Sequence, residues 1–211
     1  MRRMNTNRIL AAAIGLAFLT GCGTPAANEK AADEAEKLQA VLGSADSILQ
    51  KIDVEKAENS ARQIKNNSQF IQSNIPKMGD TLDFNTALFL TDYRSLYKDF
   101  EVVEKNHRLL RQAIDSSRIN LGNLVSDLRS NSLTAGLSPD SAVAYEKRQA
   151  AQLREFAIDI QKRLAQATTQ YDSLVPRVNE YLELIKQRTG NVPMPLPPKK
   201  EDEKEGKKEN D

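Results

Sequence analysis

Residues 89–128 read FLTDYRSLYKDFEVVEKNHRLLRQAIDSSRINLGNLVSDL, and mostly apolar side chains recur along them at alternating steps of four and three. The recurring positions are Phe89, Tyr93, Leu96, Phe100, Val103, His107, Leu110, Ile114, Ser117, Leu121, Leu124 and Leu128. This spacing places all of them on one face of an α-helix, as in the seam of a coiled coil. It predicts a helix over about residues 83–130, capped at its start by Asp80 or Asp83.

The segment before this helix carries two shorter apolar stripes and predicts a helix over about residues 31–75. The first stripe is Leu38, Leu42, Ala45, Leu49 and Ile52, and the second is Val54, Ala57, Ala61, Ile64, Ser68, Ile71 and Ile75. The two stripes are out of register near Asp53, so we expect either a kink there or a new helix capped by Asp53. Pro76 and Gly79 then end the helix.

The segment after the central helix predicts a third helix over residues 139–189. Ser138 is a typical cap, Pro139 suits the first helical position, and Asp140 is an early acidic residue. The stripe is Leu153, Phe156, Ile160, Leu164, Ala167, Tyr171, Leu174, Val178, Tyr181 and Ile185. Because the stripe resumes in phase beyond Pro176, we expect a kink at this proline, and Gly190 to close the helix.

Together these stripes predict an all-α fold. Three helices of about 45–50 residues, each about 70 Å long, pack most simply as an elongated, antiparallel, coiled-coil-like bundle over residues 33–189. The chain has only nine glycines and eight prolines, which favours long helices. Residues 190–211 are proline-rich and then highly charged, so we expect a disordered tail. An up-down-up path would place this tail at the opposite end from the N-terminus.

The first 22 residues, MRRMNTNRILAAAIGLAFLTGC, have the pattern of a secretory signal. Three arginines open the segment, an apolar run follows over Ile9–Leu19, and small residues come last. An apolar run this short would span only about 16 Å as a helix, against a bilayer core of about 30 Å. Its length therefore argues against a transmembrane anchor.

The end of this segment, Leu19-Thr20-Gly21-Cys22, resembles the lipobox of bacterial lipoproteins, and Cys22 is the chain's only cysteine. The resemblance covers residues 1–22. It implies removal of signal peptide 1–21, attachment of a diacylglycerol to the Cys22 thiol, and acylation of the new amino terminus, for example by palmitate. Residues 22–32, which are small and polar, would then form a lipidated tether. The alternative is an ordinary signal peptide with a chance cysteine.

The same resemblance implies a place in the cell envelope. Each buried CH₂ of a lipid contributes about 0.8 kcal/mol, so two or three acyl chains hold a protein stably on a membrane. Lipoproteins that lack Asp after the cysteine usually go to the outer membrane in enteric bacteria. Gly23 fits that pattern, which implies an outer-membrane protein facing the periplasm if the organism has two membranes.

Charge and composition argue against nucleic acid and against catalysis. Without Arg2, Arg3 and Arg8 the mature chain has 27 basic and 29 acidic residues, so it has no strong positive field. The only histidine, His107, follows Glu104 in the Glu-x-x-His spacing of di-iron bundles, but those sites need a second such pair. A polar seam residue that fixes helix register is the simpler interpretation. We predict no catalytic residue, no bound metal and no cofactor.

The remaining candidates are aromatic side chains. Those on the seams predict ordinary core, with a groove for an apolar ligand as the alternative. Phe70, Phe84 and Tyr97 lie off or beside the stripes and are the candidates for a partner surface. The charged tail could contact peptidoglycan or a protein, although a solvated spacer is the default interpretation.

These observations predict a structural or interaction protein, a lipid-anchored scaffold or tether with a protein partner in the envelope. One alternative is a ligand-binding or chaperone-like module that encloses a cavity near Phe100 and Tyr171. Another is an envelope stress sensor that signals through a change in helix packing.

Overall fold

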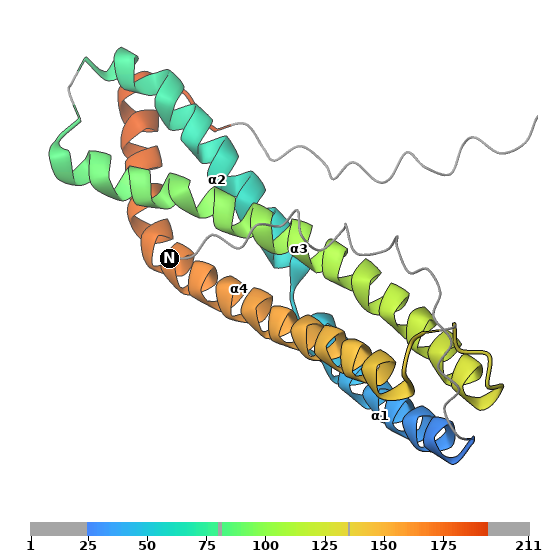
Figure 1. Cartoon of the computed structure of the whole chain (residues 1–211). Helices are drawn as coiled ribbons and strands as arrows, with labels where there is room; N and C mark the ends of the chain where they lie inside the picture. The colour runs from blue at the N-terminus through green and yellow to red at the C-terminus, as the bar shows by residue number, and fades with distance from the viewer. Residues whose placement is uncertain (1–24, 80–81, 135, 194–211) are drawn as a thin grey trace, which may run out of the picture. The chain divides into compact units, whose positions relative to one another are not determined.

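The computed structural model describes residues 25–79, 82–134 and 136–193 (Figure 1). Within these ranges the structure is helical and contains no strand, which confirms the predicted all-α class. The α-helices are α1 (Pro25–Gln50), α2 (Val54–Asn74), α3 (Phe84–Arg129) and α4 (Pro139–Thr189), and a short 3-10 helix, η2, covers Ile75–Met78. The predicted signal peptide 1–21, the predicted lipidation site Cys22 and tail residues 194–211 lie outside the described residues.

The described residues form four α-helices, not the predicted three, because the segment predicted over about 31–75 is divided. Helix α1 ends at Gln50 and α2 begins at Val54. Asp53 caps α2, since its carboxylate accepts a hydrogen bond of 2.8 Å from the backbone N–H of Lys56. Of the two interpretations of the register change, a kink or a new cap, the structure shows the cap.

Helix α1 also begins earlier than expected. It starts at Pro25, so residues 25–32 of the predicted tether are helical. Pro25 fits the first helical position, where a missing backbone N–H leaves no bond unmade. Ala31 and Ala32 are fully buried, and this burial explains why small residues that look like a tether instead form a helix.

The two long helices begin and end close to the predicted residues. At the start of α3, the Asp83 carboxylate accepts hydrogen bonds from the Thr86 hydroxyl and, at 3.0 Å, from the Thr86 backbone N–H. The hydroxyl first and then the backbone N–H lower the pKa of Asp83. In α4, the Ser138 hydroxyl accepts from the Ser141 backbone N–H at 3.2 Å. Pro176 lies inside α4, which continues to Thr189 and bends in its C-terminal part (Figure 1). Gly190 ends α4 with a φ of 72°.

The chain divides into two compact units, to both of which α3 and α4 contribute. Unit 1 comprises residues 1–47 and 110–156, and unit 2 comprises residues 48–109 and 157–211. In unit 1, a core of small and aliphatic side chains joins α1 to parts of α3 and α4. Its buried members are Ala31, Ala32, Ala35, Leu38, Leu42, Leu121, Leu128, Val143 and Ala150.

Unit 2 packs α2 against the first part of α3 and the last part of α4, and its core is aromatic. Tyr93 and Phe100 of α3 are at most 1% exposed. The Tyr93 and Tyr171 rings stack with centroids 6.0 Å apart, and Phe100 meets Tyr171 edge-on at 5.8 Å. Phe89 meets Tyr181 edge-on at 6.4 Å. Because the earlier residue of α3, Phe89, pairs with the later residue of α4, and Phe100 pairs with the earlier Tyr171, α3 and α4 run in opposite directions within unit 2.

Candidate interaction surface

The three residues predicted for a partner surface differ in exposure and do not form one cluster. Phe84 begins α3 and is 79% exposed, whereas Phe70 on α2 and Tyr97 on α3 are half-buried. Thirteen positions separate Phe84 from Tyr97, which is roughly 20 Å along a helix. The Tyr97 hydroxyl donates to the Glu101 carboxylate at 3.3 Å, and desolvation followed by that nearby charge raises its pKa. Phe84 is therefore the one apolar side chain of the three that is open to a partner.

Sequence reasoning missed Leu88, which lies four residues after Phe84 and is 50% exposed. A spacing of four places the two side chains on the same face of α3, so they form an apolar ridge, defined here as Phe84 and Leu88. Both residues are large and apolar but are not members of the seam that begins at Phe89. An apolar side chain outside the seam is the sequence signal that identifies them as surface candidates. In unit 1, Ile119 and Tyr145 are also exposed apolar side chains outside the stripes.

A groove lies beside this ridge in unit 2, between the end of α2 with η2 and the start of α3. Its volume is about 240 Å³, and we call it the α2–α3 groove. The residues that line it are Ser68, Ile71, Gln72, Ile75, Leu82, Ala87, Leu90, Thr91 and Arg94. The lining combines apolar side chains with polar ones that can donate hydrogen bonds. It therefore suits a mostly apolar segment that also has hydrogen-bond acceptors.

Polar side chains attach α2 to the aromatic core of unit 2. The Asn67 amide donates to the Tyr93 hydroxyl at 3.1 Å, and the Tyr171 hydroxyl donates to the Gln63 amide oxygen at 2.8 Å. Burial raises the pKa of both tyrosines, so both remain neutral donors and acceptors at ordinary pH. The aromatic seams are thus packed against one another and against hydrogen-bonded amides, as predicted for core residues. Near Phe89, the Arg177 guanidinium lies 4.3 Å from the ring centroid.

His107 lies on the seam as predicted and is half-buried. Its Nε2 is 3.3 Å from the backbone oxygen of Leu49, in the last turn of α1. The Leu49 carbonyl also accepts a hydrogen bond of 3.1 Å from the Ile52 backbone N–H, so a ring N–H directed at this oxygen supplies a second donor to its two lone pairs. His107 therefore joins α3 to the C-terminal end of α1 through a polar contact within unit 2.

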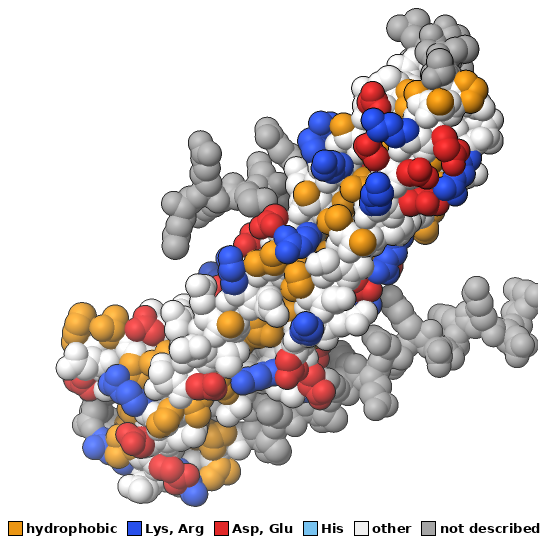
Figure 2. All heavy atoms as spheres, turned by 90° about the horizontal axis from the view of Figure 1, so that it is seen from below, with side chains coloured by type: hydrophobic (Ala, Val, Ile, Leu, Met, Phe, Trp, Pro, Cys, Tyr) orange, Lys and Arg blue, Asp and Glu red, His pale blue; other side chains and the backbone are white. Residues whose placement is uncertain are grey.

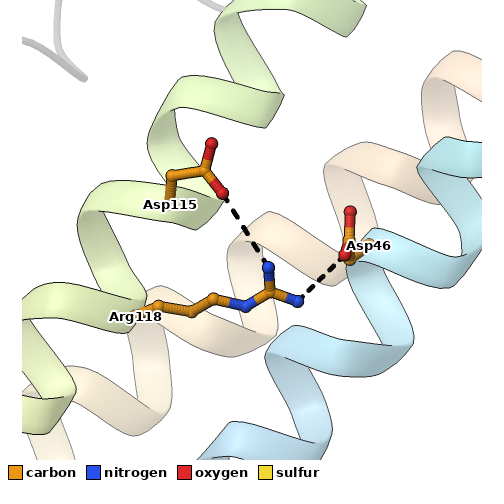
Figure 3. A network of polar contacts seen from close by, with 3 residues as sticks. All are labelled: Asp46, Asp115 and Arg118. Carbon is orange, nitrogen blue, oxygen red and sulfur yellow. Dashed lines mark hydrogen bonds and ion pairs between the residues drawn. The ribbon is translucent and has the colours of Figure 1, made fainter.

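In unit 1, α1 and α3 are joined by ion pairs. The Arg118 guanidinium lies 2.9 Å from the Asp46 carboxylate on α1 and 3.8 Å from Asp115 on its own helix (Figure 3). Near the other end of α1, Arg129 lies 2.8 Å from Glu36 and 3.8 Å from Glu29. The hydrogen bond that Arg129 donates to the Glu36 carboxylate raises the pKa of Arg129. Because Asp46 pairs with Arg118 and Glu29 with Arg129, α1 and α3 run in opposite directions within unit 1.

The surface mixes both signs of charge. Figure 2 shows acidic and basic side chains interspersed on the face in view, with apolar side chains between them. Across the described ranges, no group of three or more His, Cys, Asp or Glu side chains is placed to hold a metal ion. None of the described helices is both long and apolar enough to cross a membrane.

Comparison of the chain with protein-family models, with curated proteins and with solved structures found no match.

Proposed function

We propose that this chain is a lipid-anchored helical protein of the cell envelope that acts as a scaffold or tether for a protein partner. The observation that supports the anchor is the order of features in residues 1–22, namely basic residues, an apolar run and Leu19-Thr20-Gly21-Cys22. The anchor residue would be Cys22. In an organism with two membranes, the protein would lie on the outer membrane and face the periplasm.

A binding role is favoured over a catalytic one by the chemistry of the described residues. The sole histidine is directed at a backbone carbonyl, and Tyr93 and Tyr171, whose pKa is raised by burial, are held in the core of unit 2. By contrast, the ridge of Phe84 and Leu88 presents two large apolar side chains to solvent. Exposed apolar side chains grouped on one face are typical of surfaces that meet a partner. We propose this ridge as part of the partner surface.

The proposal includes the finer arrangement expected from the seams, an elongated antiparallel bundle followed by a solvated tail that could contact peptidoglycan. Helix α4 has 51 residues, about 77 Å at 1.5 Å per residue. Small-angle X-ray scattering of the chain without residues 1–22 measures this directly. A maximum dimension well above about 80 Å is expected, and a smaller value would contradict the elongated arrangement.

Crosslinking in intact cells tests the scaffold function. We expect the wild-type chain to give a discrete crosslinked partner from the membrane fraction, and Cys22→Ser to lose the membrane fraction and the crosslink together. The double change Phe84→Ser with Leu88→Ser should keep the membrane fraction and weaken the crosslink. Ile119→Ser, an exposed residue of unit 1, is the matched control. Retention of Cys22→Ser on the membrane would remove the basis of the proposal.

The ligand-binding alternative requires a different feature of unit 2. It needs an enclosed cavity near Phe100 and Tyr171, whereas these two rings contact each other directly. The α2–α3 groove, at about 240 Å³, is below the range of roughly 300–1,000 Å³ usual for pockets that enclose a small molecule. The scaffold is therefore the function that we propose.

A further inference from the structure

We propose that residues 194–198 of this chain, Met-Pro-Leu-Pro-Pro, bind in the α2–α3 groove of unit 2. The proposal concerns the groove and this segment, and it does not rest on the envelope function. It is argued from the chemistry of the groove, from the point where the described chain ends, and from the length of chain available.

The groove suits an extended apolar segment. Its floor is formed by the side chains of Ile71, Ile75, Leu82, Ala87 and Leu90. At about 240 Å³ it has room for one or two side chains, and residues 194–198 offer Met194 and Leu196. The prolines between and after them favour an extended backbone, which needs little further ordering to bind along a groove.

The polar rim of the groove matches the backbone of a proline-rich segment. Proline has no N–H to donate, so such a segment presents mainly carbonyl oxygens, which need donors. Gln72 and Arg94 line the groove and are both exposed, and their amide and guanidinium groups are donors. The groove therefore offers the two kinds of contact that a Pro-rich peptide uses, apolar side-chain sites and hydrogen-bond donors.

The described chain ends at the same end of α2 as this groove. After α4 closes at Gly190, the Asn191 amide donates to the Asn74 amide oxygen at 2.7 Å, which joins the end of the chain to the end of α2. Asn74 lies two residues from Gln72 and one from Ile75, so Asn191 is at the level of the groove along α2. Val192, the next residue, is 59% exposed.

The intervening distance is within reach. A helix is about 10–12 Å wide with its side chains, so half its circumference is roughly 16–19 Å. From the tether at Asn191, the five steps to Leu196 span about 16 Å and the six steps to Pro197 about 19 Å in a polyproline conformation. Because the segment is tethered at Asn191, its effective concentration at the groove is high, in the millimolar range that short tethers give. A weak intrinsic affinity is then enough to keep the groove occupied.

Disulfide trapping in the full-length chain tests this proposal. One variant carries Gln72→Cys in the groove together with Pro197→Cys in the tail. The matched control carries Ser73→Cys with Pro197→Cys, because Ser73 is also exposed and adjacent to Gln72 but does not line the groove. A chain with Pro197→Cys alone reports any bond to Cys22, the native cysteine. Peptide mass spectrometry after mild oxidation identifies each linkage.

We expect the 72–197 linkage to form at least about fivefold more than the 73–197 linkage, and independently of protein concentration, since docking raises the local concentration at one site only. Equal yields for the two pairs would overturn the proposal. A 72–197 linkage found only between two chains would also overturn it, because a second copy would then occupy the groove.

A tail variant makes the test independent of folding. Leu196→Asp changes a residue that follows α4 in the sequence and is expected to reduce the 72–197 yield to the level of the control, since a carboxylate cannot enter the apolar floor. Leu196→Met, which keeps an apolar side chain of similar volume, should retain the yield. An unchanged yield with Leu196→Asp would overturn the proposal.

Discussion

Two phenylalanines of α3 show how differently single residues contribute in unit 2. Phe100 is fully buried and contacts Tyr171, whereas Phe84 is 79% exposed. We expect Phe100→Ala to lower the free energy of unfolding by about 3–5 kcal/mol, because it leaves a cavity among aromatic rings. Phe84→Ala should change it by less than about 0.5 kcal/mol. Urea unfolding measures both, and a large loss for Phe84→Ala would show that its side chain is buried in solution.

Glu146 on α4 predicts a pH dependence in unit 1. Partial burial raises the pKa of its carboxyl group, because desolvation disfavours the charged form. The folded chain therefore holds this proton more tightly than the unfolded chain. The resulting contribution to stability is present below the unfolded pKa, near pH 4, and is lost as the pH rises through the folded pKa.

Glu146→Gln removes this titration, so the variant should gain stability over the wild type as the pH rises from about 4 to 7. Urea unfolding at both pH values gives the comparison. Glu180→Gln, a change at an exposed carboxylate of the same helix, is the control and should show a smaller change with pH. An equal effect of Glu146→Gln at pH 4 and pH 7 would contradict the prediction.

The partners of single residues were the least predictable feature. The seam identifies His107 as a polar residue on a packed face, but its partner is a carbonyl 58 positions away in the sequence. Similarly, hydropathy overlooks Asn67 and Asn74, which are at most 7% exposed and form hydrogen bonds with Tyr93 and Asn191. A buried amide looks like a surface residue until the group that satisfies it is known.

At the scale of elements, the cap at Asp53 explains why the predicted first helix is divided. Asp53→Ala should lower the free energy of unfolding by about 0.5–2 kcal/mol, since it leaves a backbone N–H at the start of α2 without its acceptor. Asp53→Ser should restore most of the loss, because a serine hydroxyl can also accept. Thermal unfolding followed by circular dichroism measures both changes. A neutral Asp53→Ala would mean that solvent replaces the cap.

Helix ends were predictable where capping residues and periodicity agree. The segment 139–189 begins and ends as predicted, because Ser138, Pro139 and Gly190 define its limits and the stripe continues through Pro176. The start of α1 was missed, because an alanine-rich segment has almost no apolar contrast between its faces. Its helical state depends on packing of Ala31 and Ala32 in unit 1, which a local pattern does not reveal.

At the scale of the whole molecule, the all-α class followed from long seams and few glycines, whereas the division into two units did not. The seam of α3 is continuous from Phe89 to Leu128, so nothing along it marks the boundary near residue 109. The boundary reflects which side chains meet across helices. Small residues of α1 gather in unit 1 and aromatic rings gather in unit 2.

The proposed anchor makes a prediction about the covalent state of the chain. Intact-mass spectrometry of the protein extracted from its own cells should find residues 1–21 removed and Cys22 carrying acyl chains, a mass increase removed by Cys22→Ser. The anchor should also make detergent necessary for extraction, since two or three acyl chains hold the protein on a membrane. An unmodified thiol at Cys22 in the natural protein would exclude the lipoprotein assignment.

A residue gained or lost during evolution would have unequal effects along this chain. Within α3 or α4, one inserted residue rotates every later side chain by about 100°, so half of a seam would turn away from its core. The three residues between α1 and α2 already interrupt the helical phase, and α2 restarts from its own cap. Length variation among related chains should therefore collect at residues 51–53, while α3 and α4 keep a constant number of residues.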